Sequence, residues 1–380
     1  MKEGSLDDLI DRYDPSAPLA RARTIPATWY TDARIAALEA HTVFSRSWQM
    51  IGRGAQLREP GQFVTADVAG ERILAVRGSD HVLRAFFNVC RHHAAAVMTE
   101  ATGCAHALRC PYHGWTYTLE GKLLGTPEWT GVEAFDKSAN GLLPVECETW
   151  ENWVFVRLDQ GGPTLSQSLG NDLRARIGRL ALSNLHWFER RRYTLACNWK
   201  VYVDNYLDGG YHVPHLHKGL ASVIDNTAYK IETGERFCIQ SSPLAPASDR
   251  RTDAHTAAVR QGDEALYAWI YPNFMINAYE GVADTNLVVP LAVDRTEVIF
   301  DYYFADATDA ARERNEASIA VSEQIQNEDV AICESVQRGL ASRSYEAGRL
   351  SVRREAGEHL FHRLLHADLK GGATPIHPQR

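Results

Sequence analysis

Hydrophobic and polar residues change their pattern twice along the chain, and this divides it into three segments. Residues 1–45 form an arm with one helix expected at about 32–46. Residues 46–160 carry short alternating runs cut by Gly and Pro, which predict strands of an antiparallel β domain. Residues 161–380 mix helical and strand patterns. The clearest strands of the middle segment are expected at 62–68, 72–76 and 153–158.

The third segment has the character of an α+β domain. Long helices that pack on one face of an antiparallel sheet give this fold class. The polar, unpatterned stretch 241–264 predicts a mobile loop near a cavity mouth. Strands are expected at 193–197, 265–279, 285–293 and 297–304, and helices at 166–180, 308–340 and about 355–369.

Composition restricts the class of partner. The chain has 380 residues, enough for two domains, and a formal net charge of −8 with no long basic run, which argues against nucleic-acid binding. No stretch approaches the ~18 consecutive apolar residues of a membrane span, and the acidic N-terminus does not resemble a targeting peptide. The seven scattered cysteines argue against a disulfide framework. We therefore expect a cytoplasmic protein with free thiols.

Residues 90–113 concentrate side chains that bind metals. Cys90 and His92 form one pair and Cys110 and His113 another, in the pattern C-x-H-x17-C-x2-H. Two thiolates and two imidazoles match a Rieske [2Fe–2S] centre, in which two His replace two Cys on one iron. A zinc site is the alternative, although zinc fingers usually group Cys with Cys and His with His. Cys104, between the pairs, has no ligand spacing and is expected to be a bystander.

A second group of possible ligands lies in residues 198–217. His212 and His217 are five residues apart, about 140° around a regular helix, so an unbroken helix could not direct both at one ion. Gly209-Gly210 and Pro214 predict the interruption that brings the two imidazoles together. Two His and one carboxylate form the facial triad of non-haem Fe(II) oxygenases. The alternative is a surface patch of histidines without a metal.

The two motifs together resemble those of Rieske non-haem iron oxygenase alpha subunits. The combination is C-x-H…C-x2-H followed by N-W-K-x3-D-N-x2-D…Y-H-x4-H, and the resemblance extends over residues 48–339. Segments 204–214 and 271–277 look like those of choline monooxygenase and related quaternary-ammonium oxygenases. The resemblance implies a Rieske β domain, a helix-grip catalytic domain with a mononuclear Fe(II), a homotrimer, and a separate ferredoxin or flavin reductase that supplies electrons from NAD(P)H.

The resemblance also implies where the third iron ligand lies. It places this ligand in segment 326–329, within a predicted helix. Helical arithmetic from the apolar residues of that helix does not separate Glu328 from Asp329, because both lie at about the same angle from the apolar stripe. The family match favours Asp329. The apolar stripe consists of Val321, Ile325, Ile332 and Val336.

Asp208 is expected to be the acid that links the two metal sites, with Asp204 in reserve and Asn205 as a further catalytic residue of the same motif. Asp208 stands four residues before His212, whereas many relatives have the acid three residues before; the choline-type branch shares this spacing. A second departure is His93, which stands where most of the family has Arg. Its role stays open.

The substrate is expected to be choline or a similar trimethylammonium compound. A quaternary ammonium has no hydrogen-bond donor and is recognised by aromatic faces. Alternation along a strand places Tyr267, Trp269 and Tyr271 on one face, where they would form a partial cage or belong to the core. The expected reaction is O₂-dependent hydroxylation of the choline-to-betaine-aldehyde type. Alternatives are oxygenation of an aromatic acid, N- or O-demethylation, and electron transfer alone; the second metal motif disfavours the last.

Overall fold

The structure is a computed structural model that describes residues 5–244, 259, 260 and 262–372. The chain divides into two compact units, one formed by residues 44–168 and the other by residues 1–43 and 169–380. No helix in the described ranges is long and apolar enough to cross a membrane. Of the predicted loop 241–264, residues 241–243 belong to a strand instead, while 245–258 and 261 lie outside the described residues.

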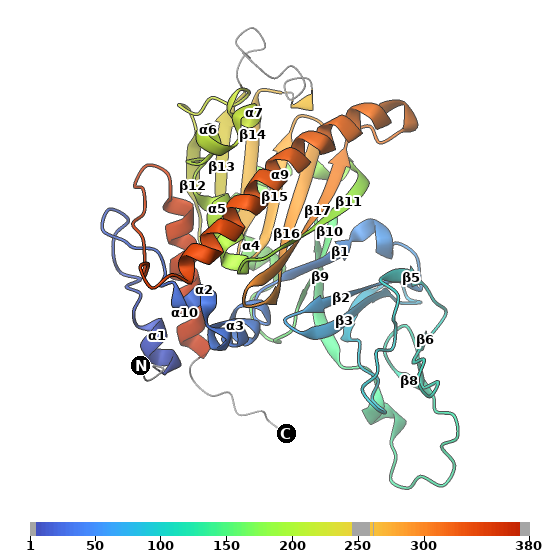
Figure 1. The fold of residues 1–380 in the computed structure, drawn as a ribbon. Coiled ribbons are helices and arrows are strands. Elements are labelled where there is room, and N and C mark those ends of the chain that lie inside the picture. Colours follow the sequence, from blue (N-terminus) through green and yellow to red (C-terminus); the bar gives the residue numbers. More distant parts are fainter. Residues whose placement is uncertain (1–4, 245–258, 261, 373–380) are drawn as a thin grey trace. The chain divides into compact units, whose positions relative to one another are not determined.

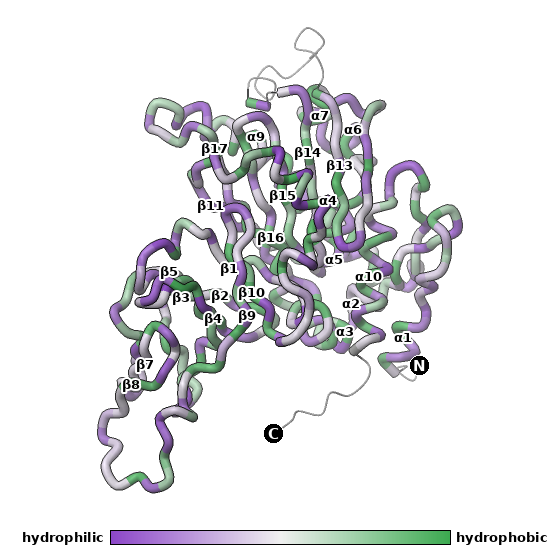
Figure 2. Tube along the Cα trace, turned by 180° about the vertical axis from the view of Figure 1, so that it is seen from behind, coloured by the Kyte–Doolittle hydropathy of each residue, from purple (hydrophilic) through white to green (hydrophobic). Residues whose placement is uncertain are grey.

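The unit formed by residues 44–168 is built from two antiparallel sheets. Hydrophobic and hydrophilic residues alternate along its trace (Figure 2), and two apolar clusters form its core. One cluster contains Cys90 and Cys110, so an apolar layer supports the predicted ligand loops. The seven-stranded sheet has the order β1 (Gln49–Arg53), β10 (Trp153–Arg157), β9 (Pro144–Trp150), β4 (Leu83–Phe87), β3 (Glu71–Arg77), β2 (Gln62–Val68) and β5 (Thr102–Cys104). The small sheet has the order β6 (Leu108–Arg109), β7 (Thr116–Tyr117) and β8 (Leu123–Gly125).

The other unit is one antiparallel sheet covered by helices, so the predicted α+β class is confirmed. The long helix α9 (Arg312–Leu340) lies across the sheet (Figure 1), and α5 (Trp199–Leu207) contacts α9, α10 (Ala356–Gly372) and the sheet. The strand order is β11 (His186–Leu195), β17 (Arg295–Phe304), β16 (Val282–Ala292), β15 (Phe274–Tyr279), β14 (Glu264–Ile270), β13 (Phe237–Pro243) and β12 (Lys230–Thr233). The remaining helices include α1 (Leu6–Ile10), α2 (Thr28–Thr31), α3 (Ala33–Glu39), α4 (Leu165–Gly178), α6 (Val213–Leu216) and α7 (Lys218–Ala221).

Two sequence expectations need correction here. The single strand expected at 265–279 is a hairpin, in which β14 and β15 pair around a turn at 271–273. The apolar stripe predicted for α9 is buried only in part: Val321 is 7% exposed, whereas Ile332 and Val336 are 40% and 44% exposed. The buried positions of α9 are both polar and apolar; they are Asn315, Ser318, Ile319, Val321, Ser322, Gln326, Asp329, Cys333 and Leu340.

A fully buried ion pair joins the N-terminal arm to the start of α5. Lys200 Nζ lies 2.7 Å from Glu39 Oε1, and the exposed fractions of the two side chains are 0% and 1%. Glu39 also accepts a hydrogen bond of 2.8 Å from Trp199 Nε1. Burial lowers the pKa of Lys200, while the Glu39 carboxylate opposes this shift. Removing one partner would leave a buried charge without compensation.

We expect Glu39→Ala to lower the free energy of unfolding by about 3–5 kcal/mol, because it strands the Lys200 ammonium in the interior. The double variant Glu39→Leu with Lys200→Met removes both charges and should recover most of that loss. Urea and thermal unfolding of the three proteins measure the difference. A single variant as stable as the parent would show that the pair does not anchor α5.

Candidate metal centres and cavity

The four predicted cluster ligands lie on two loops of matching conformation. In the first, the backbone N–H of Ala94 donates to the carbonyl of Cys90 at 3.0 Å; in the second, Gly114 N–H donates to Cys110 at 3.1 Å. The residue four after each cysteine has a positive φ, +59° for Ala94 and +71° for Gly114. The two turns bring the rings of His92 and His113 to 4.7 Å between centroids. The structure thus gathers both Cys/His pairs.

The side chains of these loops fit an iron–sulfur cluster. Both thiols are buried, and burial, together with the neighbouring Cys90 thiol, raises the pKa of Cys110. His92 Nδ1 is also buried, with no hydrogen-bond partner among the described residues. Such orphaned polar atoms are rare in native proteins, and a metal bound at Nδ1 accounts for this one. Two thiolates and two imidazoles are the donor set of a Rieske [2Fe–2S] centre.

Cys104 and His93, the two further residues that the sequence singled out in this region, are exposed. Cys104 is exposed on β5, outside both ligand loops. His93 is exposed, with its ring 4.0 Å from the ring of His92.

The second metal motif lies where α5 ends. Asp208 is the C-cap, and Gly209 and Gly210 both have φ of +68°, which glycine adopts without strain. A Cβ on Gly209 would come within 2.0 Å of the carbonyl oxygen of Arg354, so no larger residue fits without movement. The predicted interruption by Gly209-Gly210 is therefore present. Pro214 was expected to contribute to it, but lies in the first turn of α6, where its missing N–H has no helical partner to lose.

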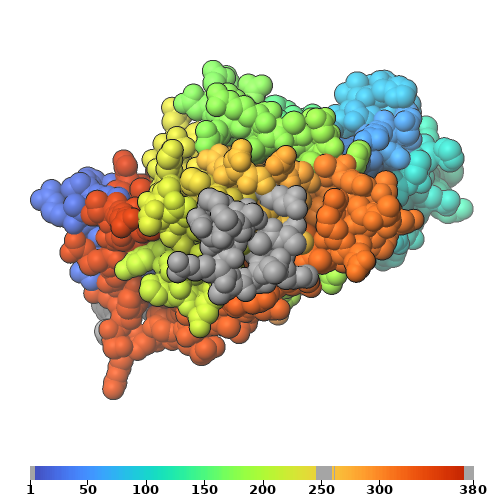
Figure 3. All heavy atoms as spheres, turned by 90° about the horizontal axis from the view of Figure 1, so that it is seen from above, coloured from blue at the N-terminus to red at the C-terminus, as the bar shows by residue number. Residues whose placement is uncertain are grey.

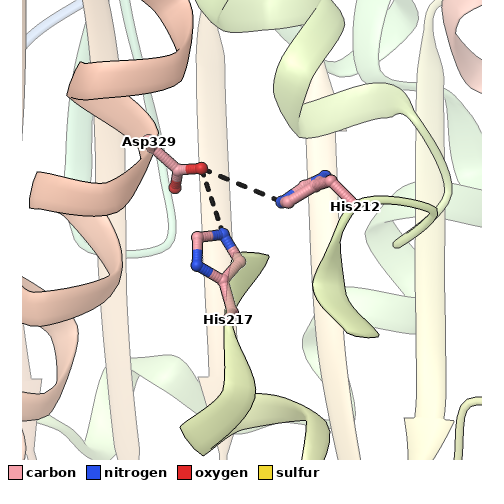
Figure 4. Close-up of side chains that lie close together, drawn as sticks. All are labelled: His212, His217 and Asp329. Atoms are coloured by element: carbon pink, nitrogen blue, oxygen red, sulfur yellow. Dashed lines mark hydrogen bonds and ion pairs between the residues drawn. The ribbon is translucent and has the colours of Figure 1, made fainter. Parts of the chain in front are cut away.

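His212, His217 and Asp329 converge on one point, with ligand atoms all within 4.8 Å of one another (Figure 4). His217 Nε2 lies 3.1 Å and His212 Nε2 3.8 Å from Asp329 Oδ1. Burial disfavours the charged imidazolium of His217, but the carboxylates of Asp329 and Glu328 outweigh it and raise the pKa of His217. The site therefore favours a positive charge. Two imidazoles and one carboxylate are the donor set of a non-haem Fe(II) centre.

Each imidazole is held by a second carboxylate through its other nitrogen. Asp208 Oδ2 lies 2.5 Å from His212 Nδ1, and Glu328 Oε2 lies 2.7 Å from His217 Nδ1. A proton on Nδ1 leaves Nε2 free to bind a metal, which is the usual outer-shell arrangement of metal-binding histidines. Glu328 and Asp329, which periodicity could not separate, thus both contact His217, but from opposite edges of the ring. The sequence did not predict this position for Glu328.

Asn205 lies at the site, as expected, and donates from Nδ2 to Asp329 Oδ1 at 2.8 Å. Asp204, the reserve for the bridging acid, lies elsewhere. It accepts a hydrogen bond of 2.5 Å from the Tyr30 hydroxyl and lies 3.0 Å from His362 Nε2, in a buried cluster that joins α2, α5 and α10. Asp208, at the C-cap of α5, contacts His212 instead.

A cavity of about 800 Å³, including the solvent at its mouth, opens beside the triad. Figure 3 shows two segments on the same side of this unit: the one with α6 and α7, in yellow-green, and the first turns of α9, in orange. The aromatic lining of the cavity consists of Tyr202, Tyr206, Tyr229, Tyr267, Tyr279 and Phe300. Its charged and amide lining includes Asn205, Asp208, Arg260, Asn277, Asp284, Asn286 and Gln326.

Of the three residues predicted to form an aromatic cage, only Tyr267 lines the cavity. Its hydroxyl lies 2.8 Å from that of Tyr279. Trp269 and Tyr271 do not line it; their rings lie 5.5 and 6.4 Å from that of Phe361 on α10. A strand rises ~3.3 Å per residue, so one face of it passes beneath successive helices. The face of β14 that carries both residues therefore borders the cavity at Tyr267 and the protein core at Trp269.

Comparison with known proteins agrees with both metal motifs. Residues 47–136 match the Rieske [2Fe-2S] domain, and residues 182–371 match the catalytic domain of ring hydroxylating alpha subunits. Choline monooxygenase from Arabidopsis thaliana is 38% identical over 375 residues, 96% of this chain and 87% of that protein. The carnitine monooxygenase oxygenase subunit of Acinetobacter pittii is 28% identical over 334 residues, 87% of this chain and 88% of that protein.

Solved structures give the same result. A quaternary ammonium Rieske monooxygenase, studied for carnitine oxidation and inter-subunit electron transfer, superposes with a TM-score of 0.83 at 27% identity, over 96% of this chain and 98% of that one. Naphthalene 1,2-dioxygenase from Rhodococcus shares the fold, with a TM-score of 0.80 at 20% identity over 99% and 100% of the two chains. The chain therefore belongs to the Rieske non-haem iron oxygenase alpha subunits, enzymes that use a [2Fe–2S] cluster and a mononuclear iron with electrons from a reductase or ferredoxin.

Proposed function

We propose that this enzyme hydroxylates a trimethylammonium compound, choline or a close analogue, with O₂ and electrons from an NAD(P)H-dependent reductase. The observation that carries the proposal is the aromatic lining of the cavity that contains His212, His217 and Asp329. The relatives named choline monooxygenase and carnitine monooxygenase support it. The same cavity disfavours a role as an electron carrier, which needs no substrate pocket.

The tyrosines suit a cation that cannot donate hydrogen bonds. Tyrosine faces attract quaternary ammonium groups through the ring quadrupole, and the attraction grows when water is excluded. Burial raises the pKa of Tyr206, Tyr229 and Tyr267 well above the usual value, so the rings stay neutral and do not become phenolates. The Tyr206 hydroxyl donates to Asn277 Oδ1 at 2.8 Å, which fixes its ring. This part of the aromatic wall is therefore held in place by the protein itself.

His212, His217 and Asp329 would hold the mononuclear iron, and Cys90, His92, Cys110 and His113 the cluster. When bound, the cluster supplies single electrons, and the mononuclear iron activates O₂ for insertion of one oxygen atom into a C–H bond. The surrounding protein fixes geometry: Asp208 and Glu328 orient the two imidazoles, and Asn205 orients the Asp329 carboxylate. The aromatic walls position the methyl groups of the substrate and exclude water.

We further propose that the chain acts as a homotrimer in the cytoplasm. Asp208 would then link His212 to a cluster imidazole, His113, of the neighbouring subunit. Its carboxylate already binds His212 Nδ1 and lies at a partly exposed position, with a side-chain exposure of 15%. A structure described for inter-subunit electron transfer supports this route. All seven cysteines are free thiols, which supports a reducing compartment.

The function is tested by reconstituting the iron-loaded protein with a reductase and NADH and measuring O₂ uptake and product together. Trimethylammonium compounds should give one product molecule per O₂ consumed, whereas aromatic acids and methyl ethers should give none. Stoichiometric turnover of an aromatic acid would instead support the alternative Rieske oxygenase activity. About three iron atoms per chain are expected, and about two would indicate an electron carrier.

Replacing Glu328 by Gln should lower the affinity for the mononuclear iron by roughly 10- to 100-fold, because outer-shell partners of histidine ligands have effects of this size. The [2Fe–2S] spectrum should be unchanged. Iron content after dialysis against a graded series of chelator concentrations measures the effect. Glu323→Gln, on the same helix but paired with Arg191 outside the cavity, is the matched control. Equal iron retention in the two variants would contradict the assigned position of Glu328.

Asp208→Asn should keep both metal sites and reduction of the cluster by dithionite, while product formation falls by orders of magnitude. The amide keeps the shape but weakens the charge-assisted hydrogen bonds of the carboxylate. Iron content, the reduced cluster's EPR signal and single-turnover product yield separate these steps. If the variant turns over normally, Asp208 is not on the route of the electron.

The inter-subunit route has its own test. A cluster-deficient chain, Cys110→Ser, mixed with an iron-deficient chain, Asp329→Ala, should recover part of the activity after proven subunit exchange. Each chain lacks what a neighbour in a mixed trimer provides. Mixed trimers without recovery would place electron transfer within one chain.

A further inference from the structure

A second group of metal-binding side chains lies outside the catalytic cavity, between α5 and α10. Asp204, Glu358 and His362 each offer one ligand atom, and these atoms all lie within 4.8 Å of one another. His362 Nε2 is 3.0 Å from Asp204 Oδ1 and 3.8 Å from Glu358 Oε1. The corresponding distances in the iron triad are 3.1 and 3.8 Å. The two groups therefore hold the same kinds of donor at similar spacing.

Helical spacing and one hydrogen bond bring the three donors together. Glu358 and His362 are four residues apart on α10, so they lie on the same face of that helix. Asp204 comes from α5, which contacts α10. The Tyr30 hydroxyl donates to Asp204 Oδ2 at 2.5 Å, while Oδ1 lies against the imidazole. A hydrogen bond of this kind is the usual outer-shell support of a metal-binding carboxylate.

The two carboxylates lack a basic side chain to balance them. Glu358 is 7% exposed and makes no hydrogen bond among the described residues; its ion-pair contact there is the one of 3.8 Å with His362. In the described ranges, no lysine or arginine forms an ion pair with Asp204 or Glu358. Burial and then the neighbouring carboxylates, first that of Asp204, raise the pKa of Glu358 well above its usual value. A buried carboxylate is costly unless a cation compensates it.

A cavity beside the group provides room for a cation and for water. Its volume is about 550 Å³, including the solvent at its mouth, and both Asp204 and Glu358 line it. Imidazole nitrogen and carboxylate oxygen bind zinc at about 2.0–2.2 Å, so the ligand atoms of a tetrahedral site lie about 3.3–3.6 Å apart. The observed distances of 3.0 and 3.8 Å lie on either side of this range. The donor set and its spacing thus fit a small divalent cation.

We propose that Asp204, Glu358 and His362 form a further metal site, which binds a divalent cation of the Zn²⁺ type. The ligand atoms are Asp204 Oδ1, Glu358 Oε1 and His362 Nε2, and water in the cavity completes the coordination. The ion supplies the missing positive charge and joins α5 to α10. Its role is structural: none of the three ligands lines the catalytic cavity, but the next residue on α5, Asn205, supports Asp329.

Zinc uptake by the iron-loaded protein tests this site. After anaerobic equilibration with Zn²⁺ and removal of the excess, we expect about one zinc per chain in addition to about three iron atoms. Glu358→Gln keeps the shape but removes a charged ligand. It should weaken zinc binding by at least roughly 10- to 100-fold, the effect of losing an outer-shell partner alone. Equilibrium dialysis with metal analysis measures the dissociation constant.

Glu355→Gln is the matched control. Glu355 lies just before α10, and its carboxylate also acts on Glu358 through its charge, but it accepts a hydrogen bond from the backbone N–H of Ser351 and is not a ligand. This variant should bind zinc within a few-fold of the parent. An equal loss in the two variants would show that zinc responds to the general negative charge of the region, and the proposed coordination would be wrong.

Thermal unfolding distinguishes a lost ligand from a damaged fold. Zn²⁺ should raise the unfolding temperature of the parent and of Glu355→Gln, but not that of Glu358→Gln. Without zinc, Glu358→Gln should unfold no earlier than the parent, because the amide imitates the protonated acid. If this variant does not fold, anomalous diffraction at the zinc edge from crystals of the parent decides, with a peak expected among Asp204, Glu358 and His362.

Two further results would overturn the proposal. Zinc uptake matched by an equal loss of iron would place the zinc in the iron triad or the cluster. Absence of zinc uptake would mean that protons, one of them on Glu358, balance the charge and that the group is a hydrogen-bonded contact between helices. Neither result bears on the substrate, so the proposed function is tested separately.

Discussion

The catalytic unit depends on keeping α5 and α9 in fixed register, because each helix leads to only part of the iron site. The chain that leaves α5 supplies His212 and His217, and α9 supplies Asp329. The bond from Asn205 to Asp329 joins the two helices directly at the site. Behind α5, the Glu39–Lys200 pair and the cluster around Asp204 hold the helix against the N-terminal arm and α10. These buried polar contacts form the foundation of the site.

The charges at the site favour a cation. Three carboxylates, those of Asp208, Glu328 and Asp329, contact two imidazoles, so the group carries an excess of negative charge in a partly buried place. The carboxylates of Asp329 and Glu328 favour protonation of His217, whose pKa they raise against the effect of burial. A divalent cation held by His212, His217 and Asp329 would balance this charge in place of a proton, and Asp208 and Glu328 would fix the direction of the two Nε2 lone pairs.

The sequence predicted the fold class, both metal motifs and the interruption at Gly209-Gly210, because these depend on local patterns and on ligand spacing. The sequence did not predict the position of a side chain where that position depends on which other helix or strand packs against its own. The alternation on β14 predicted one aromatic face correctly, but not that Trp269 would lie under α10. The orientation of Glu328 toward His217 Nδ1 depends on the path of a segment more than a hundred residues away. Arg260 stands beside an unpatterned stretch, where periodicity carries no information.

The partly wrong prediction for α9 shows how the site gains its precision. Hydrophobicity selected the exposed Ile332 and Val336, whereas the part of the buried face that borders the cavity is polar and contains Ser322, Gln326 and Asp329. Successive turns of this face are held by hydrogen bonds: Ser322 to Tyr302, Gln326 to Tyr202 and Asp329 to Asn205. Apolar packing tolerates a small slide of one helix on another, whereas a directional hydrogen bond is lost beyond a few tenths of an ångström. A helix positioned at several turns in this way cannot slip without breaking every bond, and this fixes Asp329 to the accuracy that metal binding requires.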